Sequence, residues 1–188
     1  MVVVGKLRTL LSGEDSQVAY NIQTDPMHSV FFRQLYLYAM NQSKDPSTQN
    51  AALLTDSGSG IIAIECNNIP DNVQETEDRW ERPNKYHYVE HAERNVLYKA
   101  IKLGVPTLNL TMYCPWYSCS DCARAIIQCG IRRVIGHKEY FDRTPERWKE
   151  SCAIGLQMMQ EAGIDCMVWS GEVGGRTKIL IDGEEFNP

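Results

Sequence analysis

The chain has 188 residues, of which 43% are hydrophobic and 9% aromatic, as is usual for a globular protein with one sizeable core. Its 19 basic and 24 acidic residues give a net charge of −5, which argues against a general nucleic-acid binder because such proteins carry a basic stripe. No apolar run approaches the roughly 18 residues of a membrane span, and residues 1–4 are too short for the apolar part of a signal peptide. We therefore expect a cytoplasmic protein with no membrane partner.

The cysteine count supports the same compartment. Seven cysteines are an odd number, and without a signal peptide they favour free thiols over disulfides. Two of them belong to the motif described below. We expect the other five to be small buried residues: Cys66, Cys114, Cys129, Cys152 and Cys166.

The first third of the chain predicts an extension, a helix and a hairpin. Residues 1–24 contain only weak apolar runs and are interpreted as an N-terminal extension. A helix is expected over residues 26–43, because proline suits the first helical position and a broad apolar pattern follows it. The short apolar runs 51–55 and 60–65 predict two strands, joined by a glycine-containing turn.

A polar segment over residues 70–84 follows the hairpin. Dedicated loops beside a site usually contact the ligand, and guanidinium groups pair well with phosphate oxygens. Arg79, Arg82 and Lys85 are therefore candidate phosphate-binding residues. The alternative is a solvated run of charges.

The second half of the chain alternates strands and helices. Strands are expected within residues 106–113, 133–136 and 165–169, and a long helix over 145–163. This alternation predicts parallel pairing at one end of the sheet. Residues 171–188 form a C-terminal tail with one more strand-like run.

Two short motifs contain the residue types of a hydrolytic zinc site. They are His91-Ala92-Glu93 and Cys119-Ser120-Asp121-Cys122, which fit the H-x-E and P-C-x-x-C signature of zinc deaminases. Zinc prefers four ligands, and a catalytic site keeps one position for water. His91, Cys119 and Cys122 would supply three ligands, and Glu93 would carry protons. Ser118 replaces the proline of the signature, and we expect its side chain to cap the helix that begins at Cys119.

Both motifs stand where a helix is expected to begin. A helix N-terminus carries partial positive charge, which favours thiolates, so two helix starts would face one metal ion. A Cys-x-x-Cys pair alone also occurs in structural zinc knuckles and redox sites. The accompanying histidine and glutamate favour the catalytic interpretation.

Residues 27–170 resemble the zinc-dependent cytidine and deoxycytidylate (dCMP) deaminases, in particular bacterial and phage dCMP deaminases. The run 85–95 is similar to the family's Lys-Tyr-Pro-Tyr-Val-x-His-Ala-Glu-Leu-Asn, and 114–127 is similar to its cysteine segment. The resemblance implies a three-layer α/β/α sandwich with a mixed five-stranded sheet, over residues 25–170. It also implies one catalytic Zn2+ ion per chain and the conversion of dCMP to dUMP and ammonia, which supplies thymidylate synthesis.

The resemblance extends to contacts with substrate. Asn67 would bond the sugar or base, unless it only shapes a turn, and Trp116 would stack on the pyrimidine, unless it is a core residue. Two positions depart from the family. Asn68 replaces a glycine in a segment that also touches an allosteric nucleotide, and Arg94 replaces a leucine. For Arg94, a salt bridge, a phosphate contact and a plain surface position all stay open.

The family also implies partners. We expect a homo-oligomer, plausibly a hexamer, with dCTP as activator and dTTP as inhibitor, in the cytoplasm or in the host cytoplasm if a phage encodes the protein. No polymeric nucleic acid is expected. The alternatives are a zinc deaminase of another nucleotide or base (dCTP, a purine or a modified nucleotide) and a non-catalytic zinc-binding module.

Overall fold

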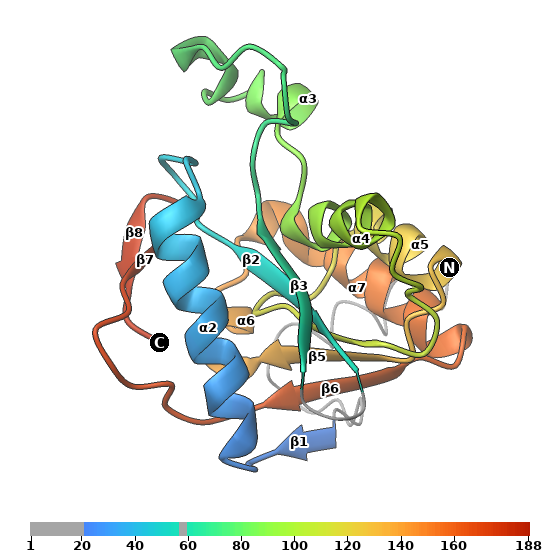
Figure 1. Ribbon diagram of the computed structural model, residues 1–188. Helices are drawn as coiled ribbons and strands as arrows, with labels where there is room; N and C mark the ends of the chain where they lie inside the picture. Colours follow the sequence, from blue (N-terminus) through green and yellow to red (C-terminus); the bar gives the residue numbers. More distant parts are fainter. Residues whose placement is uncertain (1–20, 57–59) are drawn as a thin grey trace, which may run out of the picture.

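The computed structural model describes residues 21–56 and 60–188 and contains one large mixed sheet (Figure 1). Most of the predicted N-terminal extension lies outside the described residues. The strands lie in the order β1-β6-β5-β4-β2-β3, in which β2 pairs antiparallel with β3 and β4 while the other pairs are parallel. Their bounds are β1 (Asn21–Gln23), β2 (Ala51–Thr55), β3 (Ile61–Cys66), β4 (Thr111–Tyr113), β5 (Arg133–His137) and β6 (Asp165–Trp169).

Helices cover both faces of this sheet. One face carries α4 (Ala92–Lys102), α5 (Ser120–Gln128) and α7 (Glu146–Glu161), and the other carries α2 (Met27–Gln42) with the short α6 (Lys138–Phe141) (Figure 1). The predicted α/β/α sandwich is therefore confirmed, and β2 to β6 are its five predicted strands. The edge strand β1 is an addition that the sequence did not predict, because a run of three residues is too short to reveal a strand period.

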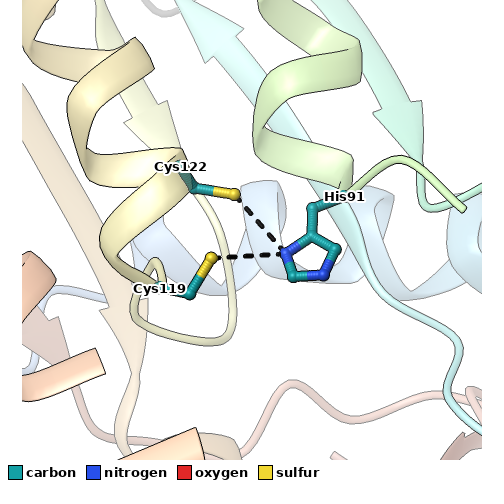
Figure 2. Close-up of side chains that lie close together, drawn as sticks. All are labelled: His91, Cys119 and Cys122. Carbon is teal, nitrogen blue, oxygen red and sulfur yellow. Dashed lines mark hydrogen bonds between the residues drawn. The ribbon is translucent and has the colours of Figure 1, made fainter. Parts of the chain in front are cut away.

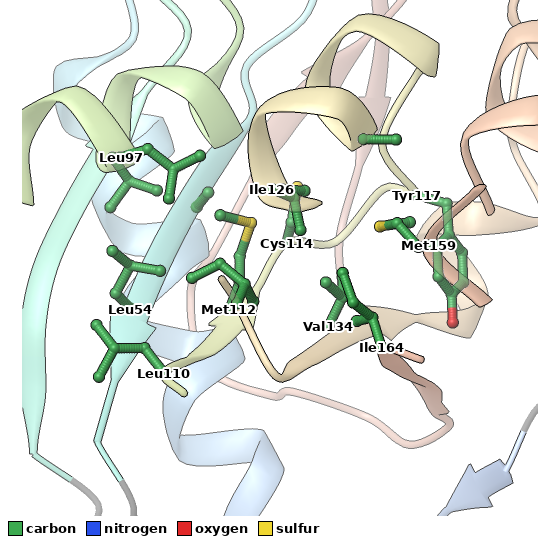
Figure 3. Packing of buried hydrophobic residues seen from close by; sticks show 14 of the residues in the cluster. Leu54, Leu97, Leu110, Met112, Cys114, Tyr117, Ile126, Val134, Met159 and Ile164 are labelled. Carbon is green, nitrogen blue, oxygen red and sulfur yellow. The ribbon is translucent and has the colours of Figure 1, made fainter. Parts of the chain in front are cut away.

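Two hydrophobic clusters fill the spaces on either side of the sheet. In β2 every residue is buried, with Ala52 and Leu54 facing one cluster and Leu53 facing the other. A strand covered on both faces reads as a continuous apolar run, which is why 51–55 was recognisable. Figure 3 shows Leu54, Leu97 of α4 and Ile126 of α5 in the cluster that supports the two motif helices.

The C-terminal residues pack on the α2 side. They form a two-stranded hairpin of β7 (Ile179–Ile181) and β8 (Glu184–Phe186), and Phe186 contacts Tyr36 of α2 edge to face. Asp182 and Gly183 connect the strands with φ values of 55° and 89°. Positive φ at both positions is typical of a type I′ turn, which matches the twist of the two strands.

A separate arm projects beyond the sheet between β3 and α4. It contains the short helices η1 (Glu77–Arg79) and α3 (Lys85–Tyr88) and leads directly to the first motif (Figure 1). In the part of the chain that the structure describes, no helix has both the length and the apolar character needed to cross a membrane.

Candidate metal centre and substrate pocket

The two motifs meet at the first residues of α4 and α5. His91 and Cys119 have extended backbones and immediately precede these helices, and Cys122 lies in the first turn of α5. Nδ1 of His91 lies 3.6 Å from Sγ of Cys119 and 3.5 Å from Sγ of Cys122 (Figure 2). The predicted arrangement, with two helix starts facing one point, is present.

These separations fit a zinc ion. With zinc–sulfur bonds of about 2.3 Å and zinc–nitrogen bonds of about 2.0–2.1 Å, tetrahedral geometry places sulfur and nitrogen ligands about 3.6 Å apart. All three ligand atoms lie within 4.8 Å of one another, and no other such group of three occurs among the described residues. Three protein ligands leave the fourth position of a tetrahedron for water, as in catalytic sites.

The thiols of this candidate zinc site are electrostatically unequal. The pKa of Cys119 is lowered to about 4, first by the hydrogen bond from Cys122 and then by that from His91. The thiol of Cys122 has a raised pKa, because it donates to Cys119 and is buried. The lowered pKa of Cys119 favours its thiolate, which is the form that binds metal.

Arg94 lies beside the second sulfur. Its guanidinium forms an ion pair with Glu90, and its Nη1 lies 3.5 Å from Sγ of Cys122. Of the interpretations left open by the sequence, the salt bridge is present, and a contact with phosphate stays a prediction. The guanidinium also adds positive charge next to a sulfur ligand.

Glu93 lies in the first turn of α4 and is 4% exposed. Burial raises its pKa, although the nearby imidazole of His91 opposes the rise. A carboxyl whose pKa is closer to neutrality can both accept and return a proton, which is the requirement for a general acid–base group.

A pocket of about 270 Å3 opens beside these groups. Its lining combines the candidate site with cations and aromatic rings: Asp45, Thr48, Asn50, Asn67, Arg82, Lys85, Tyr86, Val89, His91, Ala92, Glu93, Arg94, Trp116, Tyr117, Cys119, Asp121, Arg147, Trp148, Ser151 and Cys152. Four of the five predicted substrate contacts are therefore pocket residues. The fifth, Arg79, is not among them, and its guanidinium lies over the ring of Tyr88.

A buried polar network forms one wall of the pocket. Asn67 Nδ2 donates to Oδ2 of Asp45 at 2.8 Å and to the carbonyl of Thr48 at 2.7 Å. Lys85 Nζ donates to the same Asp45 oxygen at 2.6 Å and to Oγ of Ser47 at 2.7 Å. Asn67 and Lys85 thus hold the wall together, and their contacts with substrate stay predictions, as does that of Trp116. Asp45 was missed because it lies in a polar loop without a motif.

Residues of α7 complete the other wall and were also missed. The ring of Trp148 packs edge to face on His91, with ring centroids 5.5 Å apart, and also contacts Tyr86. Arg147 reaches the pocket mouth beside Arg82. The sequence showed only a helix start here, because the approach of α7 to the site is a property of the tertiary fold.

The prediction that Ser118 caps α5 is wrong. The residue at the cap position is Cys119, and the buried hydroxyl of Ser118 has no hydrogen-bond partner among the described residues. Instead, the backbone N–H of Ser120 donates to Oγ of Ser151 in α7 at 3.1 Å. Ser118 stands one residue too early to act as a cap.

The sequence of this chain is similar to those of known proteins. The family model described as "Cytidine and deoxycytidylate deaminase zinc-binding region" matches residues 26–138. The deoxycytidylate deaminase of Mus musculus is 32% identical over 163 residues, which cover 84% of this chain and 86% of the relative. That of Pongo abelii is 32% identical over 111 residues, which cover 56% of this chain and 61% of the relative.

A solved structure shares the fold. The dCMP deaminase of cyanophage S-TIM5, in complex with dCMP and dUMP, superposes with a TM-score of 0.59 at 21% identity. The match covers 78% of this chain and 98% of the phage chain.

Proposed function

Because the chain belongs to the cytidine and deoxycytidylate deaminase family, whose zinc-binding region it contains, we propose that it hydrolyses dCMP to dUMP and ammonia. One observation carries the proposal: three candidate ligand atoms lie at zinc-compatible separations, and two of the three residues, His91 and Cys119, line a pocket together with the buried Glu93. The relatives named deoxycytidylate deaminase support the choice of dCMP.

In this proposal His91, Cys119 and Cys122 hold one zinc ion per chain. A bound zinc ion would supply a Lewis acid that lowers the pKa of water to about 7. Glu93 accepts one proton from the attacking water and delivers it to the ring nitrogen, and then takes the remaining proton from the new C4 hydroxyl and delivers it to the departing amino group. The water oxygen forms a bond to C4, the bond from C4 to the exocyclic nitrogen breaks, and ammonia leaves.

The pocket walls would hold the nucleotide. In this proposal the ring of Trp116 stacks on the base and Asn67 bonds the sugar or base. Arg82 and Lys85 bind the phosphate, and all four residues line the pocket. Arg79 stays a prediction from the sequence. The hexamer, and dCTP and dTTP as effectors, also stay predictions, which solution mass and effector-dependent assays would test.

The direct test is ammonia release by the zinc-loaded protein on dCMP, dCTP, CMP, deoxycytidine, dAMP and dGMP. We expect turnover of dCMP well above that of the other compounds. Turnover of a purine or of dCTP without turnover of dCMP would favour the alternative, a deaminase of another nucleotide with the same metal chemistry.

A further inference from the structure

The C-terminal hairpin presents a carboxylate to two arginines at the mouth of the pocket. Arg82, from the arm, donates from Nη2 to Oδ1 of Asp182 at 2.5 Å. Arg147, from the first turn of α7, donates from Nη2 to the same oxygen at 2.6 Å and from Nη1 to Oδ2 at 2.9 Å. Three segments that are far apart in the sequence thus meet at the carboxylate of Asp182.

The hairpin is held against the pocket wall by its backbone. The N–H of Gly183 donates to the carbonyl of Ser47 at 2.7 Å, and the N–H of Asp182 donates to Oγ1 of the pocket residue Thr48 at 3.2 Å. The N–H of Gln49 donates to the carbonyl of Leu180 at 2.8 Å. These bonds fix the turn, so that Asp182 at its tip points to the two guanidinium groups.

The other cations of the pocket have partners of a different kind. Lys85 is bound to Asp45, whose side chain is fully buried, and Arg94 is bound to the partly buried Glu90. By contrast, the side chains of Asp182, Arg82 and Arg147 are 33%, 40% and 39% exposed. These three side chains are accessible to solvent, so an anion that enters the pocket can reach the two guanidinium groups and compete with the carboxylate for them.

From this geometry we infer that Arg82 and Arg147 form the subsite for the 5′-phosphate of the substrate, and that Asp182 occupies this subsite until the phosphate displaces its carboxylate. The inference rests on the proposed function and deepens it. Guanidinium groups form the same bidentate hydrogen bonds with carboxylate and with phosphate, so the two anions compete for the position between Arg82 and Arg147. A nucleoside without a phosphate does not have to displace Asp182, so the competition lowers the affinity for the monophosphate and leaves that for the nucleoside unchanged.

The test compares two substitutions at the subsite with one control. Asp182→Asn removes the competing charge, keeps the side-chain size and tolerates positive φ. Arg147→Gln removes one guanidinium. Asp165→Asn is the control, because Asp165 forms a similarly exposed ion pair with Arg133 elsewhere in the fold. Steady-state kinetics with dCMP and deoxycytidine is combined with titration of inorganic phosphate followed by phosphorus NMR.

For Asp182→Asn we expect the KM for dCMP to fall about two- to fivefold and phosphate to bind more tightly by a similar factor, with deoxycytidine turnover unchanged. For Arg147→Gln we expect the KM for dCMP to rise about tenfold or more and phosphate binding to weaken. The control should match the wild type in both measurements.

Two results would overturn the inference. Weaker phosphate binding in Asp182→Asn would mean that the carboxylate orients the arginines rather than competing with the ligand. Unchanged phosphate binding in Arg147→Gln would mean that the phosphate binds elsewhere. If dCMP is not deaminated at all, the proposed function fails, and the phosphate titration still tests the subsite. If dCMP is deaminated but neither substitution changes the affinity for inorganic phosphate, only this inference fails.

Discussion

Glu93 combines three properties that a proton carrier needs. It is buried, it lies in the first turn of α4 two residues after His91, and it lines the same pocket as His91 and Cys119. Because none of the three ligand atoms comes from Glu93, its chemistry and metal binding are separable in experiments.

The substitution Glu93→Gln should leave zinc in place and remove activity. The amide keeps the shape of the side chain but does not accept a proton, so turnover should fall by about 10²–10⁴-fold. Metal content and ammonia release measured on the same sample check both parts. Glu161→Gln, at the exposed end of α7, is the control. Full turnover in Glu93→Gln would contradict the role of Glu93 as the proton carrier, whereas absence of turnover in the zinc-loaded wild type would favour a non-catalytic zinc-binding module.

The buried pair of Lys85 and Asp45 supports the pocket wall. The substitution Lys85→Met leaves an unpaired carboxylate in a buried position, which should lower the free energy of unfolding by about 3–5 kcal/mol. Denaturant titration measures this loss. The double substitution with Asp45→Asn should recover a large part of it, and a loss below about 1 kcal/mol in Lys85→Met would show that the pair contributes little.

At the scale of elements, the site depends on how closely α7 approaches the loop before α5. A Cβ atom on Gly155 would lie 2.4 Å from the carbonyl oxygen of Ser118 and 3.1 Å from the carbonyl carbon of Cys119. Both contacts are with backbone atoms, which have no rotamer to move away. The absence of a side chain at this position therefore sets the place of a zinc ligand.

The substitution Gly155→Ala should disturb the fold and the metal together. Overpacking of this kind costs about 1–3 kcal/mol, and the segment that carries Cys119 has to move to relieve it. We expect a lower midpoint of denaturation and weaker zinc binding in competition with a chelator. Ile154→Ala, at the exposed neighbouring position, should leave zinc binding unchanged. Wild-type zinc affinity in Gly155→Ala would contradict the coupling.

Local sequence patterns predicted the elements that carry the zinc motifs, but not the walls around them. Apolar runs marked β2 and β6, and the ligand spacing placed Cys119 and Cys122 at one helix start. Asp45 and Asp182 contact pocket residues that lie between 22 and 100 positions away in the sequence. No local sequence pattern encodes such long-range contacts, so the residues that form the pocket walls could be identified only from the structure.

At the scale of the molecule, the candidate zinc site joins two helices that share one face of the sheet. The ligand atoms of α4 and α5 approach one another only in the folded chain, so metal binding should stabilise the fold. Zinc at about one hundred times its Kd should contribute about 2.7 kcal/mol.

Removal of the metal should therefore lower Tm, and added zinc should restore it. Differential scanning calorimetry with and without a chelator measures the shift. The substitution Cys119→Ser should reduce the dependence of Tm on zinc, because one thiolate ligand is lost. A Tm that changes neither with chelator nor with added zinc would argue against a metal at this site.

The most direct test of the account is mass spectrometry of the product formed from dCMP by the zinc-loaded protein in water labelled with heavy oxygen. We predict dUMP with one heavy oxygen atom at C4 and one ammonia released for each dUMP. Recovery of unchanged dCMP, from protein that holds one zinc ion per chain, would contradict the proposal that this pocket is a hydrolytic dCMP deaminase site.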